Sequence, residues 1–194
     1  QNSDGTWRSD ERSGELVADA LLAAYRSQPD FPWRDYDIWD PLDFDGDGNH
    51  EESDGYLDHL VLIVAGKGQE TCQSLYGIED KLNENSSRDA FQSLTAVEQA
   101  CANRIWSHRN ALSDNLGKGP VVGGKSNPRG GIALGNGLWF ADYNVQNEYT
   151  DASTFIHEFG HSLGLPDIYA GSTSNSTGSW DSMSATSSPL PQEL

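Results

Sequence analysis

The stretch TFIHEFGHSLGLPDIY, residues 154–169, constrains the fold and chemistry of the chain more than any other. His157 and His161 are four residues apart, so on a helix both imidazoles project from one face and can hold one metal ion. Glu158 points about 100° away from His157, which suits a base beside a metal-bound water rather than a ligand. The alternative is a surface helix that carries two solvated histidines and an acid.

The residues after His161 favour the metal site over that alternative. Gly164 suits the left-handed position that ends a helix, and Pro166 cannot continue one. The turn that they predict can carry Asp167 back toward the two imidazoles. Two histidines and one carboxylate bind zinc with a fourth position open for water, as in catalytic rather than structural sites.

Composition limits the class of protein. The chain has 194 residues, enough for one domain, and its 36% hydrophobic and 10% aromatic content excludes a disordered chain. The net charge of −18 argues against nucleic acid or an anionic membrane as a partner. The sequence has no apolar run of about 18 residues that could span a membrane. The chain begins at Gln1 without a signal-like segment and ends in SPLPQEL, which indicates a processed segment of a longer precursor.

Hydrophobic periodicity and turn residues predict an α+β fold, because helices and strands interleave without a regular βαβ alternation. Three helices are expected, at residues 13–28, at about 87–101 and from near Asp151. Strands are expected at 57–66 (buried), within 103–109, and at 131–145, where a Gly-Asn-Gly turn interrupts them. The Asp-, Gly- and Pro-rich stretches 30–56 and 113–131 are predicted to be loops.

The segment DFDGDGNHEESD, residues 43–54, matches a twelve-residue calcium loop. The candidate ligands are the carboxylates of Asp43, Asp45, Asp47 and Asp54 and the backbone carbonyl of Asn49. Asp54 replaces the usual bidentate glutamate, and Asp58 is an alternative ligand. Six acids in twelve residues repel one another, and bound Ca²⁺ would remove that penalty. The other interpretation is a solvated acidic turn.

Cys72 and Cys101 are the two cysteines of the chain. They are compatible with one disulfide, which would stabilise the fold in an oxidising compartment. The alternative is two free, buried thiols.

The segment HEFGHSLGLPD fits the extended metzincin pattern H-E-x-x-H-x-x-G-x-x-H/D, with Asp167 where most metzincins have a third histidine. Metzincins also have a tight turn that places a methionine beneath the metal. The one methionine here, Met183, follows Asp167 by sixteen residues in SWDSMSA. We therefore interpret it as the Met-turn residue rather than as a gap-filling core side chain.

Four segments together resemble the immune inhibitor A family of secreted bacterial zinc metalloendopeptidases, and they span most of residues 40–184. In chain order they are DFDGDGNHEESDGYLDHLVLIVAG, IWSHR, HEFGHSLGLPDIY and GSWDSM. The resemblance implies a metzincin-like zincin domain with a twisted mixed sheet, secretion, and protein or peptide substrates. It implies that zinc is held by His157, His161 and Asp167, with Glu158 as the catalytic base and Met183 in the supporting turn. Tyr169 is a candidate oxyanion donor or, equally, a packed side chain.

The expected organisation is a single metallopeptidase domain over residues 1–194, with 1–164 as the upper subdomain and 165–194 as a partial lower one. Family members continue past the Met-turn, whereas this chain ends at Leu194. The remainder is therefore expected either as a cleaved C-terminal fragment, which would be a partner, or as truncated. The rival hypothesis is a calcium-stabilised extracellular binding or adhesion module with an inert zinc site. Glu158 and the open fourth position favour the enzyme, since an inert site could lose both.

Overall fold

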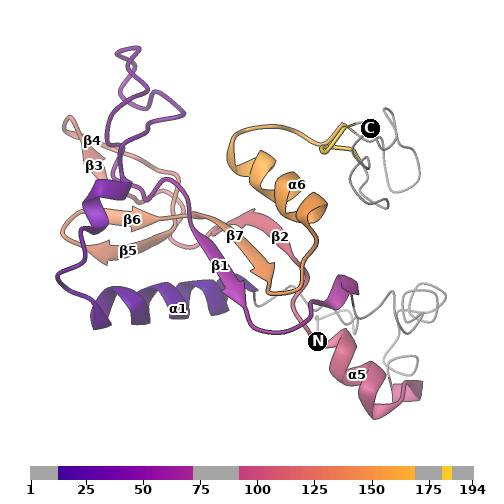
Figure 1. Ribbon diagram of the computed structural model, residues 1–194. Helices are drawn as coiled ribbons and strands as arrows, with labels where there is room; N and C mark the ends of the chain where they lie inside the picture. The colour runs from indigo at the N-terminus through magenta and orange to yellow at the C-terminus, as the bar shows by residue number, and fades with distance from the viewer. Residues whose placement is uncertain (1–12, 72–91, 169–180, 185–194) are drawn as a thin grey trace. The chain divides into compact units, whose positions relative to one another are not determined.

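The computed structural model describes residues 13–71, 92–168 and 181–184 (Figure 1). The chain divides into two compact units. The first comprises Gln1–Ser13, Ile63–Arg109 and Val145–Leu194, and the second comprises Gly14–Leu62 and Asn110–Asn144. This division does not fall at residue 164. The predicted subdomain boundary there stays a prediction, because most of 165–194 lies outside the described residues.

The core of the second unit lies between a helix and a hairpin. Helix α1 (Ser13–Ser27) matches the predicted first helix and buries Val17 and Leu21. Strands β5 (Ile132–Gly135) and β6 (Leu138–Phe140) pair antiparallel and bury Leu138 and Phe140. Asn136 and Gly137, between these strands, both have positive φ, as the predicted Gly-Asn-Gly turn requires.

Two smaller elements of this unit lie in stretches predicted to be loops. The short 3₁₀ helix η1 covers Trp33–Tyr36. Strands β3 (Val121–Val122) and β4 (Lys125–Ser126) form a two-residue antiparallel pair. Both are too short to produce a periodic hydrophobic pattern, so the sequence carried no signal for them.

A three-stranded sheet has the order β1-β7-β2. Its strands are β1 (Val61–Val64), β7 (Asp142–Asn147) and β2 (His108–Ala111). The backbone N–H of Asn144 donates to Leu60 O, and that of Glu148 donates to Val64 O. Both partners move forward by four residues, so β1 and β7 are parallel. Leu112 bonds to Ala141, and Asn147 bonds to the Ser107 side chain, which makes β2 antiparallel to β7. The sheet is therefore mixed, as expected.

The prediction of a buried strand over 57–66 is wrong in extent and in burial. Leu57 donates its N–H to Trp139 of β6, so this part of the run joins the hairpin and not the sheet. Only Val61–Val64 form β1, and Ile63 is 58% exposed. The physical reason is position, because among the described strands β1 lies at the edge of the sheet, with β7 as its neighbour, rather than at the centre of a covered sheet.

Helix α5 (Ala96–Ala102) covers only the end of the helix predicted at about 87–101. Thr95 begins a new helix with a capping box, in which its side chain bonds to Glu98 N–H and the Glu98 side chain bonds back. Residues 87–91 lie outside the described part. The strand expected within 103–109 begins only at His108, because Asn103 and Arg104 continue the turn that ends α5.

Helices and strands are thus both present around a mixed sheet, which agrees with the predicted mixture of elements and with a peptidase domain. Among the described residues, no helix is long and apolar enough to cross a membrane.

Candidate metal centre

Helix α6 (Ala152–Ser162) carries the two histidines and starts where the sequence predicts. Asp151 is its N-cap and accepts the N–H of Thr154 at 2.9 Å. The helix ends at Gly164, whose φ is +87°. Leu165 N–H bonds to Gly160 O and Gly164 N–H bonds to His161 O, each at 3.0 Å, which is the Schellman arrangement. The predicted helix stop is confirmed, and it directs the chain toward Pro166 and Asp167.

Both imidazoles are oriented by backbone carbonyl groups. His157 Nδ1 lies 2.7 Å from Ser182 O, and His161 Nδ1 lies 2.8 Å from Leu165 O. A carbonyl oxygen only accepts, so each ring carries a proton on Nδ1 and, when neutral, presents a lone pair on Nε2. The two Nε2 atoms lie 3.2 Å apart. Two Nε2 lone pairs at that distance repel each other, and either a metal ion or a proton between the two atoms removes the repulsion.

Asp167 completes a set of three donor atoms. Its Oδ1 lies 3.2 Å from His157 Nε2 and 3.3 Å from His161 Nε2. Donors about 2.0 Å from a tetrahedral zinc ion lie about 3.3 Å from one another. The three measured separations match that spacing, so these residues could hold zinc as predicted. The Asp167 side chain is 40% exposed, which leaves one side of the set open.

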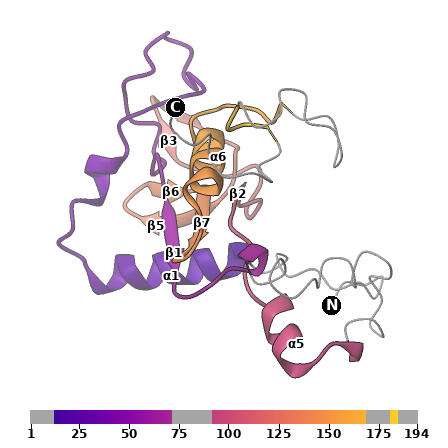
Figure 2. The same ribbon diagram turned by 45° about the vertical axis from the view of Figure 1, so that its right-hand side comes forward.

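Glu158 lies next to this donor set and is held by the sheet. The backbone N–H of Arg109, in β2, donates to Glu158 Oε2 at 2.7 Å. Figure 2 shows α6 alongside this strand. Burial raises the pKa of Glu158 above its ordinary value, while the Arg109 N–H and then the charges of His157 and His161 oppose the rise. The carboxylate is thus oriented by a backbone donor that no sequence pattern names.

Met183 lies directly beneath the helix. It is buried, and a Cβ placed on Gly160 would lie only 2.6 Å from its Sδ. The turn that contains it is closed by Asp181, whose side chain accepts Met183 N–H at 2.9 Å. A larger residue at Gly160, between the two histidines, would therefore force the Met183 side chain to move. The sequence alone offers no reason for a glycine at position 160, and the reason is its packing against the Met183 sulfur.

The structure brings together part of the predicted calcium site. Carboxylate oxygens of Asp43, Asp45 and Asp47 lie within 4.8 Å of one another. Asn49 donates its backbone N–H to Asp47 Oδ1 at 2.7 Å. Asp54 is not a member of this group. Its side chain is buried and accepts the N–H of Tyr56 at 2.9 Å.

The remaining residues singled out in the sequence are an alternative calcium ligand, a candidate oxyanion donor and the two cysteines. The alternative calcium ligand Asp58 accepts the N–H groups of Ile38 and Trp39 with its two oxygens. Tyr169 and Cys72 lie outside the described residues, so the oxyanion role and the disulfide stay predictions. Cys101 is buried in α5.

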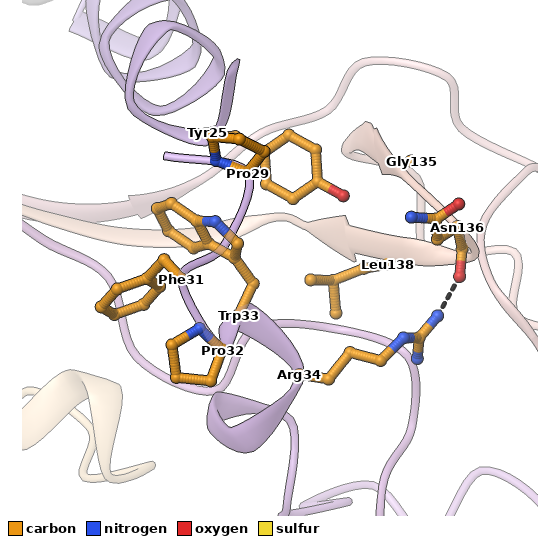
Figure 3. Close-up of a pocket in the computed structure, with 9 residues that line it drawn as sticks. All are labelled: Tyr25, Pro29, Phe31, Pro32, Trp33, Arg34, Gly135, Asn136 and Leu138. Carbon is orange, nitrogen blue, oxygen red and sulfur yellow. Dashed lines mark hydrogen bonds between the residues drawn. The ribbon is translucent and has the colours of Figure 1, made fainter. Parts of the chain in front are cut away.

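A cavity of about 270 Å³ in the second unit contains none of these residues (Figure 3). Aromatic rings of Tyr25, Phe31 and Trp33 form one side of it. Arg34, on the other side, donates to the carbonyl of Asn136. Phe31 and Trp33 rings lie 4.6 Å apart, so this wall is an aromatic cluster packed at the end of α1.

A mixed α/β domain with an H-E-x-x-H helix that faces a carboxylate is the arrangement of a metallopeptidase catalytic domain. Sequence comparison gives the family. Residues 1–99 and 92–189 match the family model described as immune inhibitor A peptidase M6, catalytic domain. The chain belongs to this family, which confirms the resemblance seen in its motifs.

Two curated relatives are similar over most of the chain. Pre-pro-metalloprotease PrtV of Vibrio cholerae serotype O1 (strain M66-2) is 37% identical over 170 residues, which cover 87% of this chain and 15% of the relative. Immune inhibitor A of Bacillus thuringiensis subsp. alesti is 33% identical over 162 residues, which cover 80% of this chain and 18% of the relative. The chain therefore spans less than a fifth of the length of either relative.

Proposed function

We propose that the chain is the catalytic domain of a secreted zinc-dependent endopeptidase. The observation that carries the proposal is the donor set. Two Nε2 lone pairs and one carboxylate oxygen converge at zinc spacing, and both rings are fixed through Nδ1. The family match and the metalloprotease relative support the same class of reaction.

In this proposal His157, His161 and Asp167 would hold the ion, which when bound would act as a Lewis acid and lower the pKa of a water toward 7. Arg109 N–H fixes Oε2 of Glu158, so Oε1 takes the proton of the attacking water. Glu158 then passes that proton to the leaving amine. Ser182 O and Leu165 O keep the imidazoles in the ligand tautomer throughout.

Met183 is proposed as the Met-turn of a metzincin-like fold. Its sulfur packs against Gly160, and the adjacent Ser182 carbonyl orients His157. One short turn therefore supports both the floor of the site and one ligand.

The proposed partners are protein or peptide substrates and a C-terminal fragment of the same precursor. The charge of −18 continues to argue against nucleic acid and anionic membranes. The Cys72–Cys101 disulfide is proposed as an extracellular feature. The rival adhesion module is not favoured by the metalloprotease relative, nor by a Glu158 that a backbone donor holds beside the donor set.

The function is tested on the purified chain with a casein substrate. One zinc per chain is expected. Removal of zinc with a chelator should abolish cleavage, and one equivalent of zinc should restore it. Cleavage that continues in metal-free protein would contradict the proposal, as would zinc-loaded protein that binds casein without cleaving it.

We also propose that Asp43, Asp45, Asp47, the Asn49 carbonyl and Asp54 bind calcium. The three grouped carboxylates support it, since a bound cation would relieve the repulsion between charges that lie so close together. Asp54 must turn from the Tyr56 N–H or use its other oxygen to join them. The contribution of the Asp54 carboxylate can be tested by comparing its charged and neutral forms.

In calcium-free buffer, Asp54→Asn is expected to stabilise the fold at pH 7.5 by about 2–3 kcal/mol. Burial of the carboxylate, which is 3% exposed, raises the pKa of Asp54 to about 6, well above its ordinary value of 3.8. The folded state therefore binds the proton more tightly. Its stabilising contribution is complete below about pH 4 and is lost as the pH rises through about 6. Asparagine mimics the protonated form at every pH.

Urea unfolding of both proteins from pH 4 to 8 measures this difference, which should vanish near pH 4. Calcium should then stabilise the native chain more than the variant. An equal stabilisation would remove Asp54 from the ligand set, and no stabilisation of the native chain would contradict the calcium site itself.

A further inference from the structure

A cluster of four polar side chains lies at the start of β2 in the first unit. It consists of Glu70, Ser107, Asn147 and Thr150, and we call it the Glu70 cluster. Glu70 Oε1 accepts from Ser107 Oγ at 2.7 Å, from Thr150 Oγ1 at 3.2 Å and from Asn147 Nδ2 at 3.3 Å. Its Oε2 accepts from the Ser107 N–H at 3.3 Å. A single carboxylate therefore connects three segments that are distant in sequence.

The hydroxyl of Ser107 is the centre of the cluster. This residue is 0% exposed. Its Oγ accepts from Asn147 Nδ2 at 2.8 Å and lies 2.6 Å from Thr150 Oγ1. Asn147 Nδ2 also donates to Ile105 O at 3.0 Å. Buried networks with this degree of satisfaction hold their members in one arrangement.

The cluster joins the two elements that determine where Glu158 points. Ser107 lies two residues before Arg109, whose N–H holds Glu158 Oε2. Thr150 lies directly before Asp151, the N-cap of α6. The hydrogen bond between Arg109 and Glu158 therefore closes a ring that starts at Glu70 and runs through both β2 and α6.

The backbone beside Glu70 is adapted to this arrangement. A Cβ on Gly68, which is itself buried, would overlap with Asn147 Nδ2 and with both Glu70 carboxylate oxygens. Any larger residue at this position would therefore displace the Asn147 and Glu70 side chains from their hydrogen bonds.

We propose that Glu70 is a positioning residue of the active site, which holds β2 and α6 so that the Arg109 N–H orients the Glu158 carboxylate. The inference rests on the proposed function for its catalytic consequence. Its structural part, the dependence of the Arg109–Glu158 hydrogen bond on Glu70, can be measured without any substrate. Replacement of groups that orient metal ligands typically lowers activity by about 10–100-fold, and we expect a loss of the same order at Glu70.

The variants are Glu70→Ala and Glu70→Gln, with Glu148→Gln as the matched control. Glu148 is an exposed carboxylate of the same unit that accepts the Gly66 N–H at 2.9 Å. The Glu148→Gln variant therefore removes the same charge as a Glu70 variant and weakens a similar bond, but outside the cluster. Glu158→Ala sets the value for a fully lost bond. Glutamine at 70 can keep an oxygen facing the Ser107 and Thr150 hydroxyls, so it should recover part of the loss.

The first measurement is hydrogen exchange of the Arg109 amide in metal-free protein by NMR. Glu70→Ala should accelerate it at least about tenfold, toward the rate in Glu158→Ala, while Glu148→Gln leaves it unchanged. The second is the kinetics of the zinc-loaded protein. Glu70→Ala should lower kcat by about 10–100-fold with KM and zinc affinity within about twofold, and Glu70→Gln should be intermediate.

Unchanged exchange at Arg109 would overturn the proposal, and so would a loss of kcat that only follows a loss of zinc. If Glu70→Ala does not fold, Glu70→Gln decides by the same exchange measurement. If even the native chain cleaves nothing, the proposed function fails, while the exchange rate of the Arg109 amide still tests the positioning role of Glu70.

Discussion

Replacement of Glu158 with glutamine is expected to lower kcat by about 10²–10⁴-fold while one zinc per chain is retained. Glutamine has the shape of glutamate and can still accept the Arg109 N–H through its amide oxygen. It cannot take a proton from water at neutral pH. Because burial already disfavours the charged form of Glu158, the neutral variant should fold at least as well as the native chain.

The measurement is kcat and KM on a fluorogenic peptide, with zinc content determined on the same samples. Glu148→Gln serves as the control, since it removes one carboxylate from the same unit and should change neither value. Full activity in Glu158→Gln would contradict the proposed mechanism. A loss of zinc in parallel with activity would mean that Glu158 is a ligand and not a base.

The second large effect is expected at Asp167. Asp167→Ala should lower zinc affinity at least about 100-fold, because it removes a negative charge and one of three donors. Activity at limiting zinc should disappear with the metal. Asp167→Asn should lie between, since an amide oxygen keeps a donor at the same reach but without the charge.

Competition with a chromophoric chelator measures these affinities. Asp151→Asn is the matched control, as it removes a carboxylate from the same helix region while asparagine caps helices as well as aspartate does. If Asp167→Ala keeps its zinc, the third ligand is another residue. If Asp151→Asn weakens zinc to the same degree, general electrostatics and not coordination explains the loss.

Local signals predicted the helix of the candidate site, its end and the grouping of three side chains. The bounds of α6 follow from Asp151 and from Gly164 and Pro166, residues whose effect on the backbone does not depend on the rest of the fold. The spacing of His157 and His161 likewise fixes their common face. The convergence of Asp167 on them required only the helix stop that the sequence predicted.

Non-local features were predicted poorly, for reasons visible in particular residues. The run 57–66 is apolar enough for a buried strand, yet its position at the sheet edge depends on pairing with β7, about 80 residues away in the sequence. The apolar pattern predicted one helix over about 87–101, and it hid the capping box with which Thr95 begins α5. The donors that orient the site belong to the backbones of Arg109, Leu165 and Ser182, and a backbone group has no sequence signature.

The predicted calcium loop combines a local feature that the sequence predicted with a non-local one that it did not. Its spacing predicted the grouping of Asp43, Asp45 and Asp47, which are close in sequence. Asp54 belongs to the same pattern but is buried against Tyr56, in a place set by packing of the following residues. Motif spacing thus predicted proximity over a few residues, whereas tertiary contacts determine the position of Asp54.

The three proposed zinc donors lie between positions 157 and 167, and this compact span has a consequence for folding. Bringing together the ends of so short a segment costs little chain entropy, far less than a site assembled from distant strands. Helix α6 and its Schellman turn therefore bring the three donors together without the long-range pairing of β1, β7 and β2, while the Ser182 carbonyl that orients His157 comes from a separate turn. We therefore expect the convergence of the three proposed donors and the orientation of Glu158 to be separable events in folding, because Glu158 gains its Arg109 partner only when β2 has paired.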